Sequence, residues 1–133
     1  MHEKPKLTIA IDGPSGSGKS SVSKEVARHF GLAYLDTGAM YRAATWYVLE
    51  RGIDLADAEA ISQAVVEMPL VFGTNIKEEE ILIGSTDVRE QIRSERVSAA
   101  VSAVASVPAV REHLIGLQRW AIGHAVNGIV AEG

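Results

Sequence analysis

Eight residues near the N-terminus, Gly13 to Ser20, have the types and spacing of a phosphate-binding loop. They read Gly-Pro-Ser-Gly-Ser-Gly-Lys-Ser and fit the pattern G-x-x-x-x-G-K-[ST]. Glycines let the chain approach an anion closely, so that backbone N–H groups surround it. Lys19 would reach the β- and γ-phosphates, and the Ser20 hydroxyl would bind Mg²⁺, a role that Ser21 could take or share. The expected cofactor-binding residues are Gly13, Pro14, Ser15, Gly16, Ser17, Gly18, Lys19, Ser20 and Ser21.

The segments on either side of the loop are those that a phosphate loop requires. Residues 7–11 are apolar and partly β-branched, which predicts a buried strand. Residues 21–30 predict a helix on which Val22, Val26 and Phe30 share one apolar face. A helix N-terminus carries partial positive charge, and it would therefore favour a bound phosphate.

A second polar turn, Asp36-Thr37-Gly38, follows the expected strand 32–35 and opens a helix from about 39 to 51. Ligands of open α/β sheets bind outside the carboxyl ends of the strands, which would place this turn near the phosphate loop. Thr37 offers a hydroxyl, Tyr41 an aromatic ring and Arg42 a bidentate fork for phosphate. The same residues also fit a capped helix start with Tyr41 half-buried and Arg42 solvated, and spacing alone does not choose between the two.

The middle of the chain changes character. A helix from about 57 to 68 ends at Pro69, and the short β-type runs 70–72 and 81–83 flank a polar segment, which predicts an antiparallel hairpin. Residues 84–87 predict a turn. Two helices follow, over roughly 94–106 and 109–126. Strand–helix alternation before and after the hairpin predicts an α/β fold with a parallel sheet and an insertion.

Residues 129–132 form an apolar run that ends in the carboxylate of Glu132. In phosphate-loop enzymes an acid at the end of a second buried strand can hold Mg²⁺ or its waters. Glu132 is therefore a candidate metal ligand together with Ser20 and Ser21, and a carboxylate at a surface turn is the alternative. A sheet that ends on such a strand suggests a truncated chain, a piece of a longer protein.

Composition narrows the functional class. The chain has 133 residues, 47% hydrophobic and 23% charged, with 13 basic and 17 acidic residues and no cysteine. A net charge of −4 argues against a nucleic-acid partner, and the absence of cysteine excludes disulfides and thiolate metal sites. No signal peptide or membrane-spanning run is recognisable, so a cytoplasmic enzyme without a membrane partner is expected.

Two motifs taken together resemble bacterial cytidylate kinase. They are Ile-Asp-Gly-Pro-Ser-Gly-Ser-Gly-Lys at 11–19 and Leu-Asp-Thr-Gly-Ala-Met-Tyr-Arg at 35–42. Ile92-Arg93, Ser102, Pro108 to Arg111 and Ala131 to Gly133 continue the likeness, as does the inserted hairpin. The resemblance implies a P-loop NTPase-type parallel sheet flanked by helices. It also implies an inserted nucleoside-monophosphate-binding region of hairpin and helices. Residues 1–67 would form the first part of the core, 68–106 the insertion and 107–133 the return to the core.

The resemblance also implies an activity. ATP with Mg²⁺ would phosphorylate CMP or dCMP to CDP or dCDP in pyrimidine nucleotide metabolism, and the enzyme would be a monomer. Lys19, Arg42 and Arg111 would be catalytic. The expected substrate-binding residues are Asp36, Thr37, Gly38, Tyr41, Arg42, Arg93, Ser102 and Arg111. The arginine-bearing lid of the family and the Arg-Asp that follows Glu-Gly are absent from these 133 residues.

Three other interpretations fit parts of the pattern. Another small-molecule P-loop kinase, for another monophosphate or for a shikimate-like acceptor, shares the loop, but the Tyr-Arg pair and the hairpin argue against it. A GTPase switch would need an Asn-Lys-x-Asp motif to read the base, and the sequence has none. A nucleotide-binding fragment without activity of its own remains open.

Overall fold

The computed structural model describes residues 7–11, 19–74, 80–125 and 128–132, and the side chains of Leu7, Lys19 and Ser20 lie outside this description. The chain divides into two compact units, each described by itself. The first comprises residues 1–38, 73–79 and 118–133, and the second comprises residues 39–72 and 80–117. The division into 1–67, 68–106 and 107–133 differs from these units and stays a prediction.

The first unit is built on a parallel sheet of three strands in the order β1-β6-β2. These strands are β1 (Leu7–Ile11), β2 (Ala33–Asp36) and β6 (Gly128–Glu132). In the register, Ile11 of β1 and Asp36 of β2 both lie beside Glu132 of β6. The three strands therefore end together. The mixed α/β fold with its parallel sheet, predicted from the sequence, is confirmed.

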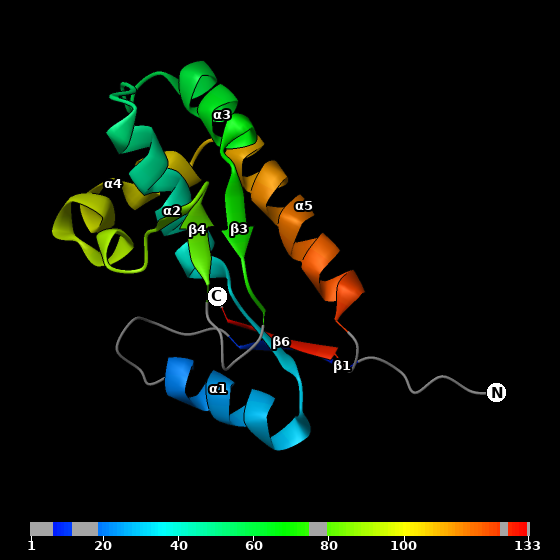
Figure 1. Cartoon of the computed structure of the whole chain (residues 1–133). Coiled ribbons are helices and arrows are strands. Elements are labelled where there is room, and N and C mark those ends of the chain that lie inside the picture. Colours follow the sequence, from blue (N-terminus) through cyan, green and yellow to red (C-terminus); the bar gives the residue numbers. More distant parts are fainter. Residues whose placement is uncertain (1–6, 12–18, 75–79, 126–127, 133) are drawn as a thin grey trace. The chain divides into compact units, whose positions relative to one another are not determined.

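Helix α1 (Lys19–Phe30) lies along this sheet, as Figure 1 shows. The predicted apolar face is correct only for Val26, which packs against the core, because Val22 and Phe30 are 54% and 57% exposed while Ser23 and Ala27 are buried. Small side chains let the helix backbone come close to the sheet, and the larger Val26 fills the margin of the core. Gly31, with φ of 64°, ends the helix. Its N–H donates to the Arg28 carbonyl and the Leu32 N–H donates to the Ala27 carbonyl, and these two hydrogen bonds form a Schellman motif.

The second unit consists mainly of helices. They are α2 (Thr37–Glu50, from Ala39 onward), α3 (Ala58–Glu67), the 3₁₀ turn η1 (Gln91–Arg93), α4 (Glu95–Ala105) and the first part of α5 (Pro108–His124). The Asp57 side chain caps α3, and the Ser94 side chain caps α4 through the N–H of Val97. The predicted helices are confirmed to within a few residues. Val48, Ile61, Val97, Val104, Val110 and Leu114 are fully buried on these helices.

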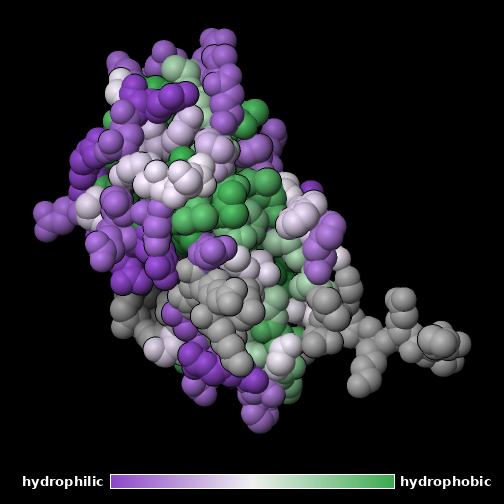
Figure 2. Space-filling view, viewed as in Figure 1, coloured by the Kyte–Doolittle hydropathy of each residue, from purple (hydrophilic) through white to green (hydrophobic). Residues whose placement is uncertain are grey.

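The predicted hairpin is confirmed: β3 (Leu70–Phe72) and β4 (Ile81–Ile83) pair antiparallel and run side by side in Figure 1. Residues 84–87 are not wholly a turn as predicted, because Thr86 and Asp87 form a third short strand, β5. Gly84, with φ of 62°, opens the two-residue connection that makes this pairing possible. Hydrophobic side chains gather over this small sheet in Figure 2. Val71 of β3 is 48% exposed.

Asp87, the last residue of β5, forms an exposed ion pair with Arg89. The Arg89 guanidinium donates to the Asp87 carboxylate at 2.8 Å, and the Arg89 backbone N–H donates at 3.0 Å. These hydrogen bonds hold the pKa of Asp87 below its ordinary value of 3.8. A lowered folded-state pKa stabilises the fold above the unfolded pKa, and this contribution is lost as the pH falls through the folded pKa.

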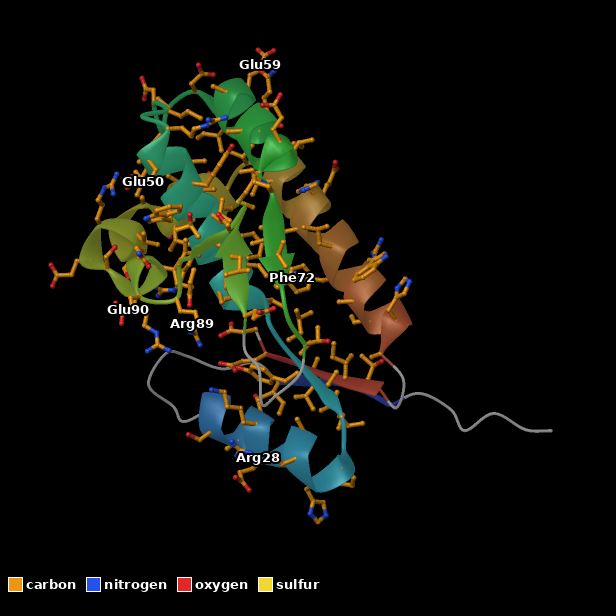
Figure 3. The ribbon with its side chains drawn as sticks, in the orientation of Figure 1. Arg28, Glu50, Glu59, Phe72, Arg89 and Glu90 are labelled. Carbon is orange, nitrogen blue, oxygen red and sulfur yellow. The ribbon has the colours of Figure 1, made fainter. Side chains whose placement is uncertain are left out.

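We therefore expect Arg89→Gln to raise the pKa of Asp87 toward its ordinary value, measured by NMR titration of the carboxyl carbon. Arg89 and Glu90 project from the turn before η1 in Figure 3. Arg96→Gln is the matched control, because Arg96 pairs instead with Glu50 at 2.8 Å. An Asp87 pKa that did not rise in Arg89→Gln would contradict the assignment of the shift to this pair.

Candidate active site

The residues expected to carry the chemistry fall on both units. Residues 13–18 of the phosphate loop lie outside the described residues, as does Gly133. Lys19 and Ser20 begin α1, and Ser21 is exposed on its first turn. The backbone that follows the loop is thus helical, as a phosphate loop requires.

Glu132 lies at the carboxyl end of β6, the central strand of the parallel sheet. Its side chain is buried at 4% exposure, so it is not the surface carboxylate that the sequence left as an alternative. The Tyr34 hydroxyl, reaching from β2, donates a hydrogen bond to Glu132 Oε2. The Tyr34 ring itself belongs to the core, with Ala27, Leu32 and Val130. The buried Glu132 carboxylate is therefore hydrogen-bonded to a tyrosine whose ring is fixed by packing in the core.

The turn predicted over Asp36–Gly38 is wrong, because Asp36 ends β2 and Thr37 already begins α2. This junction of strand and helix packs against the same strand end. Thr37 Oγ1 donates to the backbone carbonyl of Glu132 at 2.7 Å. A Cβ added at Gly38 would lie 3.4 Å from Asp36 Oδ1, which is van der Waals contact, so Gly38 lies directly beside that carboxylate. The structure thus brings Asp36, Thr37, Gly38 and Glu132 together within the first unit, which spacing alone could only suggest.

The donors at this strand end are few. Among the described residues no group of three or more His, Cys, Asp or Glu side chains could hold a metal. Mg²⁺ in nucleotide sites is usually held by one or two carboxylates with phosphate oxygens and waters, rather than by a protein cage. A single buried carboxylate at the ends of the parallel strands fits that donor set.

On the second unit, Arg42 is held by its neighbours. Its Nη1 donates to the carbonyl oxygen of Ile92 at 3.2 Å and to Ser98 Oγ at 2.9 Å. Ile92 is buried in η1, and Ser98 lies on α4, so helix α2 contacts both elements through this one side chain. Arg42 is therefore not the solvated arginine of an ordinary helix start. Tyr41 beside it is partly buried.

The other expected substrate residues of this unit have exposed side chains. Arg93 ends η1, Ser102 lies one turn after Ser98 on α4, and Arg111 lies in the first turn of α5. Among the described residues no side-chain hydrogen bond joins Arg111 to Ser102. The structure therefore links Arg42 with η1 and α4, and it leaves the other three side chains open to solvent.

Two residues that hydrogen-bond to the expected site residues, Tyr34 and Ser98, were not predicted from the sequence. Tyr34 reads as an ordinary strand residue, and only its hydroxyl among apolar neighbours hints at a polar partner. Ser98 precedes Ser102 by four residues, which places both hydroxyls on one face of a helix. The four-residue spacing from Ser102 could therefore have indicated that Ser98 lies near the expected substrate residues.

Comparison with known proteins gives a consistent result. Residues 9–133 match the family described as cytidylate kinase. A protein of Rhodococcus opacus named cytidylate kinase is 54% identical over 127 residues, which are 96% of this chain and 55% of the relative. The cytidylate kinase of Nocardia farcinica is 50% identical over 133 residues, which are 100% of this chain and 57% of that relative. The chain thus spans a little over half the length of the curated relatives it matches. Within the described residues, no helix combines the length and apolarity needed to cross a membrane.

Proposed function

The chain belongs to the cytidylate kinase family, and on that premise we propose that it serves phosphoryl transfer from ATP to CMP or dCMP. The products are CDP or dCDP and ADP. The acceptor is the 5′-phosphate of the nucleoside monophosphate. The protein acts as a cytoplasmic monomer without a nucleic-acid partner.

One observation carries the proposal: the family match extends over residues 9–133 and so includes both the phosphate loop and the Asp36–Arg42 segment. The loop alone would indicate only a user of nucleoside polyphosphates. The Asp36–Arg42 segment, with Arg42 anchored in the second unit, adds an arginine suited to a second phosphate group. Two phosphate-binding elements are what a nucleotide-to-nucleotide phosphoryl transfer needs.

The roles of the residues follow from the charges of the reactants. The acceptor oxygen is already anionic, so little general-base catalysis is required, and positioning and charge stabilisation dominate. Lys19 and the loop N–H groups bind the donor phosphates. Arg42 and Arg111 hold the acceptor and offset charge on the transferred group. Glu132, with Ser20 or Ser21, would hold Mg²⁺, which neutralises the phosphates when bound.

The remaining residues recognise the acceptor. Ser102 and Arg111 are suited to hydrogen-bond the cytosine edge, and Thr37, Tyr41 and Arg93 would contact the rest of the nucleotide. A pocket built to pair with the exocyclic amine and N3 of cytosine leaves its own groups unpaired when uracil enters. Such a pocket can discriminate strongly.

Calorimetry with CMP, dCMP and UMP tests the proposal on the chain itself, together with a coupled assay for ADP release with each acceptor. We expect CMP and dCMP to bind at least about fivefold more tightly than UMP, since unpaired polar groups cost about 1–3 kcal/mol. A change of Ser102 to alanine should reduce the ratio of CMP affinity to UMP affinity. Equal binding and equal rates with all three nucleotides would refute cytosine recognition.

A further inference from the structure

The contacts of Arg42 within the second unit are concentrated on one nitrogen. Nη1 carries two hydrogens, and it has two acceptors: the Ile92 carbonyl at 3.2 Å and Ser98 Oγ at 2.9 Å. Among the described residues, Nε and Nη2 of the same guanidinium make no hydrogen bond. The side chain is therefore fixed at one end and leaves donors at the other.

The donors that remain are the ones that recognise an oxyanion in pairs. The N–H of Nε and one N–H of Nη2 lie parallel on one edge of the planar guanidinium. This edge matches two oxygens of a phosphate or carboxylate, and such bidentate pairs are both strong and directional. An arginine held at Nη1 offers that edge in one orientation, and fewer rotamers are lost when the anion binds.

The two anchors differ in kind. The Ile92 carbonyl belongs to the backbone of η1, and Ile92 itself is 5% exposed, so this acceptor is fixed by the fold. The second acceptor, the Ser98 hydroxyl, belongs to a side chain and can be removed by substitution. Its helix is capped by Ser94 and packs through the buried Val97. A second link between α2 and α4 is the Arg96–Glu50 ion pair at 2.8 Å (Figure 3 labels Glu50). The alignment of the two helices therefore does not depend on Ser98 alone.

We infer that Ser98 is a positioning residue for Arg42. Its hydroxyl, together with the Ile92 carbonyl, holds Nη1 so that the Nε–Nη2 edge meets the phosphate of the nucleoside monophosphate. The identity of the phosphate rests on the proposed function. The hydrogen bonds that hold Arg42 Nη1 are independent of that function. Ser98 would set phosphate affinity without touching the nucleotide.

The test compares Ser98→Ala with Ser98→Thr in the 133-residue chain. CMP and cytidine are titrated in parallel, because cytidine has the base and sugar but no phosphate. We expect Ser98→Ala to weaken CMP binding about fivefold to tenfold, the scale of one ordinary hydrogen bond, and to leave cytidine binding unchanged. Threonine keeps the hydroxyl and should restore CMP binding.

Nitrogen-15 NMR of the Arg42 guanidinium supplies a readout that does not need a ligand. Rotation about the Cζ–Nη1 bond should become faster in Ser98→Ala and remain slow in Ser98→Thr. Ser106→Ala is the matched control, since Ser106 Oγ donates to the Ala103 carbonyl at 2.7 Å at the end of the same helix. It should change neither the Arg42 signals nor the ratio of CMP to cytidine affinity.

The possible results separate the two claims. Unchanged Arg42 signals and unchanged CMP affinity in Ser98→Ala would overturn the inference and leave the proposed function intact. Equal weakening of CMP and cytidine would also overturn it, because that pattern indicates a general structural role. If the wild-type chain bound no CMP, the proposed function would fail, and the guanidinium signals would still decide whether Ser98 anchors Arg42.

Discussion

Replacing Lys19 with methionine is expected to lower kcat/KM for phosphoryl transfer by roughly 10²- to 10³-fold, equivalent to about 3–4 kcal/mol of transition-state stabilisation. The physical reason is that the ammonium group is a preorganised positive charge where negative charge on the donor phosphates is greatest. Methionine keeps much of the length of the side chain and removes only the charge and the donors. Steady-state kinetics with CMP and ATP measure the effect.

Lys24→Met is the control for this change. Lys24 lies on the same helix, and its Nζ lies 5.7 Å from the centre of the buried Tyr34 ring, a cation–π contact worth about 0.5–2 kcal/mol. The control removes the same charge from a residue outside the Gly13–Ser20 motif, so kcat/KM should change by no more than a few-fold. Near-normal turnover of Lys19→Met would show that Lys19 does not contact the donor phosphates.

Much of the fold could be predicted because local signals and tertiary packing agree. Gly31 and Gly52 mark helix ends, and each has the positive φ that favours glycine there. The α1 face could not be predicted from apolarity. Ser23 and Ala27 are buried because the backbone approaches the sheet, and small size matters more than hydrophobicity at such a contact. The strand at Thr86–Asp87 is two residues long, too short for any periodicity to reveal.

The site was predictable where motif and spacing coincide, and not where a contact spans long sequence distances. The position of Glu132 at a strand end followed from the apolar run before it. Its partner Tyr34 lies 98 residues away, and only the pairing of β2 with β6 brings the two together. In the same way, Ser98 meets Arg42 across 56 residues. Sequence patterns identify residues suited to chemistry, and the residues that hold them are found from the topology.

Removing the Tyr34 hydroxyl should weaken the first unit at the end of its central strand. We expect Tyr34→Phe to lower the free energy of unfolding by roughly 1.5–3 kcal/mol, the range for a hydrogen bond to a charged group. The phenyl ring keeps its place among Ala27, Leu32 and Val130, so the change removes the donor without opening a cavity. Denaturant unfolding near neutral pH measures the difference.

A double-mutant cycle with Glu132→Gln assigns the loss to this contact, because the coupling between two residues that touch appears as non-additivity. Tyr47→Phe is the matched control: the Tyr47 ring packs against the Arg51 guanidinium at 5.0 Å, and its hydroxyl makes no hydrogen bond among the described residues. That variant should stay within about 0.5 kcal/mol of the wild type. Additive losses in the cycle would mean that Tyr34 does not hold the Glu132 carboxylate. Coupling of the expected size would establish that the carboxylate proposed to bind Mg²⁺ is oriented by the core of the sheet before any nucleotide arrives.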